Sequence, residues 1–168
     1  MRTIRTKVYQ FSELSEQAKQ KAIEWYRNTD TGDYSASWDW AIDDAKDIGL
    51  KIHSLSDHKQ NEGQFYLSAN EVAQNIFNNH GEGCETYKTA ENFMKEWQPV
   101  FNEYMTEPEN MTELEAKLID IESDFLNNLL EDYRIMYNHD IDYRNSDESI
   151  TEMLIINEYE FKADGTRF

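Results

Sequence analysis

Apolar residues recur at helical spacing between residues 112 and 141, the longest periodic run in the chain. At 100° per residue they fall on one stripe, which is the pattern of a helix that buries one face in a core. A helix of about 30 residues is about 45 Å long, and Thr112 with Glu115 forms a capping box at its start. The sequence therefore predicts one long amphipathic helix. Its buried stripe comprises Leu114, Leu118, Ile121, Phe125, Leu129 and Met136.

Carboxylates form two rows beside this apolar stripe. One row comprises Glu113, Asp120, Asp124, Glu131 and Asp142, and the other comprises Glu115, Glu122 and Asp140. In all, nine or ten carboxylates over a helix of about 45 Å give roughly one per 5 Å, comparable with the axial spacing of about 3.4 Å between phosphates of one DNA strand. We expect these eight residues to form a partner-binding surface that imitates phosphates. The alternative is an ordinary solvated helix face, on which charges also border an apolar stripe.

The negative charge of the chain is concentrated in the same region. The 168 residues carry 34 Asp+Glu against 16 Lys+Arg, a formal net charge of −18, and residues 103–160 hold 17 of the acids but only three Lys+Arg. A surface selected only for solubility usually mixes both signs. An anionic field repels nucleic acid and anionic lipid, and it attracts basic grooves. The expected partner is therefore a basic nucleic-acid-binding protein, rather than nucleic acid itself or a membrane.

Strand signals lie at both ends of the chain, with helix signals between them. Residues 3–11 are rich in β-branched and aromatic side chains, and the pair Asp164-Gly165 is typical of a hairpin turn. Residues 50–55 and 64–67 alternate weakly and predict a further short hairpin. The expected fold is α+β and mostly helical, with five or six helices around a small antiparallel sheet formed by the N-terminal strand and a C-terminal hairpin.

Caps and stops predict where the first helices begin and end. A helix follows Ser15 and ends in the polar run of residues 28–33, and Gly49 stops a second helix. Ser68 and Glu71 form a capping box for a third, because each side chain accepts a hydrogen bond from an unpaired amide of the new helix.

The third helix should end at His80 and Gly81, before the next cap. We expect the fourth helix to begin at Thr89 and to be kinked or broken at Pro99. Ser146 is the expected cap of a short last helix.

The length of the chain favours one domain, residues 1–168. Aromatic residues make up 13% of the chain, which is too much large apolar surface for a disordered acidic tail. Cys84 is the only cysteine, so no internal disulfide can form and a reducing cytoplasm is the expected compartment. The sequence contains no apolar run near the 18 residues of a membrane span, and residues 1–7 lack the apolar core of a signal peptide.

Other residues that could carry chemistry do not form a recognisable motif. His80 with Cys84 and His53 with His58 could be drawn as a zinc site, but the spacing matches no standard Cys/His pattern. His139 among acidic residues could act as an acid and base or bind a divalent cation, although a solvated helix end explains it more simply. No phosphate-binding loop and no nucleophile elbow is present in the sequence. We expect no catalytic residue, no metal and no cofactor.

The opening of the chain resembles uncharacterised small acidic proteins encoded by phages and mobile elements. Residues 8–22 read VYQFSELSEQAKQKA, an aromatic strand followed by F-x-E-L-S and an Ala/Lys-rich helix. Residues 131–136 and 159–168 are similar in kind to members of that group. The resemblance implies a mobile-element origin and an anti-defence role, such as an anti-CRISPR or antirestriction protein acting in the host cytoplasm.

Charge and resemblance together leave three hypotheses about function. The first is a non-enzymatic inhibitor that mimics nucleic acid and blocks the basic nucleic-acid channel of a host defence protein, such as a CRISPR effector or restriction enzyme. The second is an antitoxin-like or regulatory partner that binds a basic protein without such mimicry. Competition with nucleic acid separates these two. The third is an enzyme that uses the His139 region or a His/Cys metal site, which metal analysis of the purified protein tests.

Overall fold

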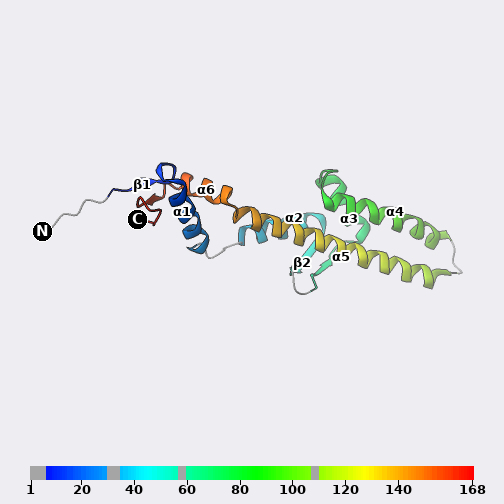
Figure 1. Cartoon of the computed structure of the whole chain (residues 1–168). Helices are drawn as coiled ribbons and strands as arrows, with labels where there is room; N and C mark the ends of the chain where they lie inside the picture. Colours follow the sequence, from blue (N-terminus) through cyan, green and yellow to red (C-terminus); the bar gives the residue numbers. More distant parts are fainter. Residues whose placement is uncertain (1–6, 30–34, 57–59, 107–109) are drawn as a thin grey trace. The chain divides into compact units, whose positions relative to one another are not determined.

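Helices connected by short loops account for most of the protein (Figure 1). The computed structural model describes residues 7–29, 35–56, 60–106 and 110–168. These residues form six α-helices, a short 3-10 helix and two antiparallel sheets of two strands each. The result confirms the predicted mostly helical α+β class.

The chain divides into two compact units, each with its own cluster of buried residues. The terminal unit consists of Met1–Ser35 and His139–Phe168, and the central unit consists of Ala36–Asn138. The expectation of one domain stays a prediction.

The two ends of the chain meet in the sheet of the terminal unit. Strand β1 (Tyr9–Gln10) pairs antiparallel with β4 (Glu160–Phe161). A tight turn then brings Arg167 back to form an isolated bridge with Phe161. The predicted N-terminal strand and C-terminal hairpin therefore do form one small sheet.

The N-terminal strand is shorter than predicted. Residues 3–6 of the expected strand lie outside the described residues. Phe11 belongs to the 3-10 helix η1 (Phe11–Glu13), so its placement in the strand was wrong. The physical reason is local, because the Glu13 carboxylate accepts a hydrogen bond of 2.8 Å from the Gln10 amide, and the chain turns there instead of continuing the strand.

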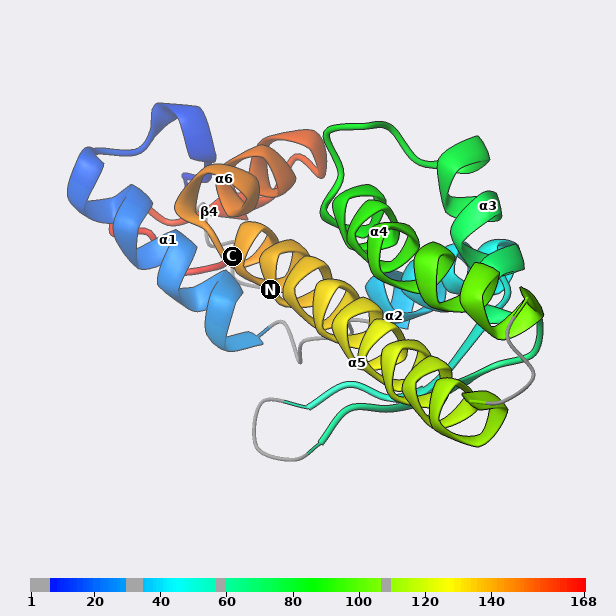
Figure 2. The same ribbon diagram turned by 90° about the vertical axis from the view of Figure 1, so that its right-hand side faces the viewer.

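Helices α1 (Glu16–Thr29) and α6 (Asp147–Ile156) lie side by side and complete the terminal unit (Figures 1 and 2). Ser146 caps α6 as predicted, because its hydroxyl accepts a hydrogen bond of 3.2 Å from the Ser149 backbone N–H. The Ser15 hydroxyl accepts a similar bond of 3.3 Å from the Ala18 backbone N–H at the start of α1. The core of this unit comprises Phe11, Leu14, Ala18, Ala22, Ile23, Ile150, Leu154 and Phe161.

The central unit is built around the long helix. Its elements are α2 (Ser35–Ile48), β2 (Leu50–Ser54), β3 (Glu62–Phe65), α3 (Ala69–Asn79), α4 (Glu85–Thr106) and the part of α5 (Met111–Arg144) that ends at Asn138. Strands β2 and β3 form the predicted hairpin, with Leu50 opposite Phe65. Both the stop at Gly49, whose φ is +100°, and the capping box of Ser68 and Glu71 are confirmed.

The apolar stripe of α5 forms the core that was predicted. Phe125 is 3% exposed and stacks on Phe93 of α4 with ring centroids 4.1 Å apart, while Phe65 of β3 contacts it at 5.5 Å. Leu118 and Leu129 are also buried. Helix α4 and the β2–β3 hairpin therefore both pack against this stripe.

Two predicted helix starts were wrong. Helix α4 begins at Glu85, so Thr89 lies inside it rather than capping it. Helix α4 continues through Pro99 to Thr106, so it is not broken there. Trp97 and Phe101, on either side of Pro99 in the sequence, stack with ring centroids 4.4 Å apart. Helix α5 begins at Met111, which places Thr112 inside the first turn instead of at the cap.

Candidate functional site

Within the central unit, the predicted carboxylates lie on either side of the apolar stripe of α5, which α4 covers. Helices α4 and α5 run beside each other in both ribbon views (Figures 1 and 2). Phe93 and Trp97 of α4 pack on the apolar stripe of α5, so the stripe itself is closed to a partner. Any partner of this region must contact the carboxylates at the edges.

Three of the eight predicted residues are held by neighbours within the central unit. Glu113 forms an ion pair of 2.8 Å with Lys117, and this contact lowers the pKa of the exposed Glu113 carboxyl. Glu122 accepts a hydrogen bond of 3.0 Å from the indole N–H of Trp97. Glu131 binds the Arg134 guanidinium through both carboxylate oxygens, at 2.8 and 2.5 Å.

Three others are exposed and have no hydrogen bond or ion pair among the described residues. They are Glu115, Asp120 and Asp124. Asp124 lines a narrow groove between α4 and α5, of about 80 Å³, together with Glu96 of α4. Asp120 lies one turn before Asp124 on the same side of α5. We call Glu96, Asp120 and Asp124 the acidic edge.

The remaining two predicted residues belong to the terminal unit. Asp140 forms an ion pair of 2.8 Å with Arg144, and Asp142 is exposed. The structure therefore divides the eight predicted carboxylates between two units, and six of them lie in the unit that contains the acidic edge.

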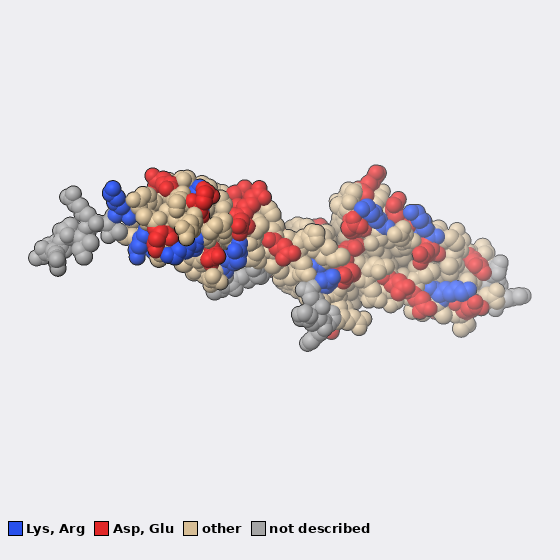
Figure 3. Space-filling model, viewed as in Figure 1, with Lys and Arg blue, Asp and Glu red and all other residues tan. Residues whose placement is uncertain are grey.

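Lysines near the acidic edge are already paired with other carboxylates. Figure 3 shows Asp and Glu side chains over α4 and α5, with Lys side chains set among them. Lys88 pairs with Glu85 at 2.6 Å and Lys95 with Glu91 at 4.0 Å, and Glu113 holds Lys117. No cation in the described part of the chain forms a direct ion pair with the acidic edge.

Asp132 is a carboxylate in the same region that the sequence analysis did not select. Burial is the main cause that raises its pKa, and the nearby Glu85 and Glu131 raise it further. The Thr89 hydroxyl donates to it at 2.7 Å, which acts in the opposite direction. Helical periodicity could have identified it, because at 100° per residue Asp132 lies on the same side of the helix as Leu114 of the apolar stripe.

A polar network joins four residues that are distant in sequence. The Tyr133 hydroxyl donates to Asp44 at 2.7 Å, and His80 Nε2 lies 3.6 Å from the same carboxylate oxygen. The other ring nitrogen of His80 is 2.7 Å from the Thr86 hydroxyl. Burial is the largest cause that raises the pKa of Tyr133. With Thr86 only 1% exposed, this arrangement stabilises the fold and does not present a nucleophile.

The residues considered for a zinc site are not brought together. Both ring nitrogens of His80 face partners within the fold, whereas Cys84 and His53 are exposed and His58 lies outside the described residues. His139 is exposed and belongs to the terminal unit. Among the residues that the structure describes, no three His, Cys, Asp or Glu are grouped so as to hold a metal ion.

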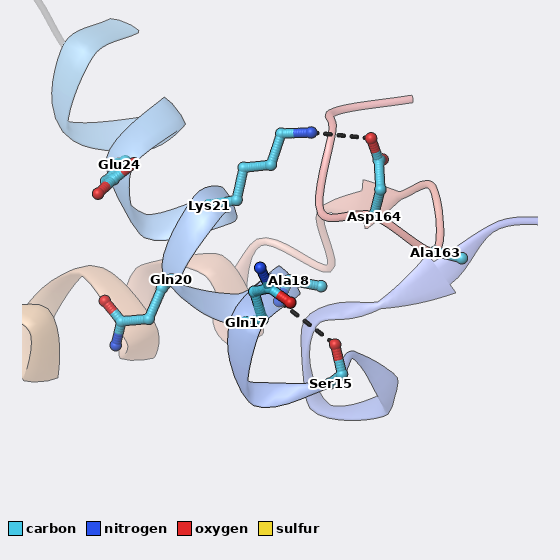
Figure 4. A pocket seen from close by; sticks show the side chains of 8 residues that line it. All are labelled: Ser15, Gln17, Ala18, Gln20, Lys21, Glu24, Ala163 and Asp164. Atoms are coloured by element: carbon cyan, nitrogen blue, oxygen red, sulfur yellow. Dashed lines mark hydrogen bonds and ion pairs between the residues drawn. The ribbon is translucent and has the colours of Figure 1, made fainter.

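The terminal unit contains a polar cavity of about 610 Å³ beside α1 (Figure 4). Lys21 points across it to Asp164, and the two form an ion pair of 2.8 Å. This contact is the largest cause that lowers the Asp164 pKa. Because its lysine and its aspartate satisfy each other, the cavity has no unbalanced charge from this pair for a ligand.

The comparisons with known proteins leave the site to be interpreted from its own geometry. None of the described helices is both long enough and apolar enough to cross a membrane. No protein-family model matches the chain, and no significant similarity to a curated protein or to a solved structure was found.

Proposed function

We propose that the protein is a non-enzymatic inhibitor whose acidic edge imitates nucleic acid and blocks the basic nucleic-acid channel of a host defence protein, such as a CRISPR effector or restriction enzyme. The observation that carries the proposal is that Glu96 and Asp124 line one groove, that Asp120 lies one turn before Asp124, and that all three are exposed and have no partner among the described residues. The lysines close by are engaged with other carboxylates.

The physical basis is long-range attraction by a rigid anionic surface. Asp120 and Asp124 are separated by about 6 Å along the helix axis, close to twice the axial phosphate spacing of about 3.4 Å along one strand. The packed core beneath them holds both helices in place, so binding requires little further ordering of the backbone. Such charges accelerate association with a basic partner and help to exclude acidic ones.

The size of the groove favours a macromolecular partner over a small substrate. Its volume of about 80 Å³ is far below that of typical small-molecule sites, which are roughly 300 to 1,000 Å³. Glu115 and Asp142 are further exposed carboxylates of α5 without a partner among the described residues, and they extend the anionic surface of their respective units.

The decisive experiment captures the partner and then tests competition. The immobilised full chain is incubated with a bacterial lysate, and captured proteins are identified and purified. Saturating the partner with its DNA or RNA should prevent binding, and the complex should weaken steeply between about 50 and 200 mM salt because exposed charges are screened. A partner that binds equally well with its nucleic acid in place would contradict mimicry and favour the antitoxin-like alternative.

A triple amide variant tests the acidic edge itself. Changing Glu96→Gln, Asp120→Asn and Asp124→Asn should slow association with the partner by about tenfold or more. The matched control removes three charges elsewhere, with Glu24→Gln, Asp39→Asn and Glu160→Gln, which are exposed and unpaired among the described residues. Equal losses in both variants would show that only net charge matters and would overturn the proposed site.

A further inference from the structure

A second surface lies in the terminal unit, in a groove between α1 and α6. Its volume is about 540 Å³, and its lining includes Phe11 and Ile23, which are 5% and 4% exposed. Helix α1 lines it from Glu16 to Ile23 and α6 from Asp147 to Glu152. Each helix therefore contributes about two turns, a length of about 10 Å.

The rim of this groove on α6 carries unpaired negative charge. Asp147 is bound by Arg27 at 2.5 Å, and Glu16 of α1 is paired with Lys19 at 2.8 Å. Glu148 and Glu152 are exposed and have no partner among the described residues. Like charges four residues apart destabilise a helix by about 0.2 to 0.5 kcal/mol. The helix dipole stabilises the negative charge of Glu148 in the first turn of α6, but it does not stabilise that of Glu152 further along the helix.

The same face of α6 continues into exposed apolar surface. Ile155 is 51% exposed and lies three residues after Glu152 and four after Thr151, which places all three on one face. Ile156 beside it is 73% exposed. The groove, which has Phe11 and Ile23 among polar side chains in its lining, thus lies next to exposed isoleucines, and Glu148 and Glu152 border it without a partner among the described residues.

We propose that this groove binds an amphipathic helical segment of a partner protein that bears lysine or arginine beside its apolar face. Helix-in-groove recognition uses apolar anchors at i, i+3 or i+4, and i+7, which fits a groove of two turns. The aliphatic part of a lysine or arginine packs on Ile155 while its charged end reaches Glu148 or Glu152. A second copy of this chain would bring the same negative rim against itself, so charge selects a basic occupant.

The proposal does not depend on the acidic edge of the central unit, because the two surfaces belong to different units. The probe is a fluorescein-labelled peptide of about 18 residues, long enough to form a helix, with leucines on one face and lysines flanking them. A scrambled peptide of the same composition has the same charge but no apolar face. Fluorescence anisotropy with the full chain measures both affinities.

Two pairs of variants locate the binding. Glu148→Gln with Glu152→Gln should weaken binding of the amphipathic peptide about tenfold, whereas Glu24→Gln with Glu160→Gln should weaken it by less than about twofold. Ile155→Ser should weaken it without changing the charge. Circular dichroism of each variant verifies that the helices are retained, and the NMR signals of residues 16–23 and 148–155 should shift on binding.

Three results would overturn the proposal: equally tight binding of the scrambled peptide, equal losses in both charge variants, or shifts confined to α4 and α5. The triple amide variant of the acidic edge should bind the amphipathic peptide like the unmodified chain. If only the triple amide variant lost peptide binding, the peptide would bind to the central unit instead. The two proposals therefore fail in different ways.

Discussion

Single carboxylates on this protein differ in what surrounds them, even where their neighbours in the sequence are alike. Glu131 and Asp132 are adjacent on α5. The first is neutralised by Arg134, whereas the second is partly buried and accepts a hydrogen bond from the Thr89 hydroxyl. The raised pKa of Asp132 means that the folded protein holds its proton more tightly than the unfolded chain does.

The sign of this effect gives a prediction for Asp132→Asn. The stabilising contribution of Asp132 is present below the unfolded pKa, near 3.8, and is lost as the pH rises through the higher folded pKa. The amide still accepts from Thr89 but carries no charge. We expect the variant to be at least as stable as the original at pH 7, with an advantage that shrinks as the pH approaches 4.

Urea denaturation at several pH values between 4 and 8 measures the difference. Asp124→Asn serves as the control, since Asp124 is exposed and belongs to the acidic edge. If the variant were less stable than the original by the same amount at every pH from 4 to 8, burial would not raise the Asp132 pKa.

At the scale of elements, α5 shows how far a helical pattern predicts a core. Leu118→Ala and Phe125→Ala should each lower the free energy of unfolding by about 2 to 5 kcal/mol, because each truncation leaves a cavity in packed surroundings. Ile119→Ala, at a site that is 60% exposed, should change it by less than about 0.5 kcal/mol. Thermal or urea unfolding checks all three, and small losses at both core sites would mean that the stripe is not buried.

The C-terminal turn provides a second test at this scale. Gly165 has a φ of +83°, and a Cβ there would lie 2.1 Å from the Ala18 carbonyl oxygen of α1. Gly165→Ala should therefore cost more than about 2 kcal/mol, because the left-handed conformation and the backbone clash both oppose it. A Cβ on Gly81 meets nothing within 4 Å, so Gly81→Ala should be nearly neutral in the same unfolding assay. Equal effects would contradict the close approach of this turn to α1.

For the whole molecule, a net charge of −18 on 168 residues acts against the folded state through self-repulsion. Raising the salt from about 50 to 500 mM should increase the melting temperature, because the repulsion is screened. The triple amide variant of the acidic edge should melt higher at low salt and respond less to added salt. Differential scanning calorimetry measures both, and a melting temperature that falls with salt would show that ion pairs outweigh the repulsion.

The apolar stripe of α5, the caps of Ser68 and Ser146, and the stop at Gly49 could be predicted from the sequence. Each depends on residues within about one helical turn of one another, where spacing alone determines which groups meet. The C-terminal hairpin was predicted for the same reason, from the local preference of its Asp-Gly pair.

Contacts between distant segments decided the rest. Only the tertiary structure separates carboxylates that are tied within the fold, such as Glu122 by the Trp97 indole 25 residues away, from Glu96, Asp120 and Asp124, which are open. Helix α4 also continues through Pro99, although a proline inside a helix removes one backbone hydrogen bond and usually bends or ends it. Two clusters of buried residues arise in the same way, because packing partners are selected by shape and burial across the chain rather than by spacing along it.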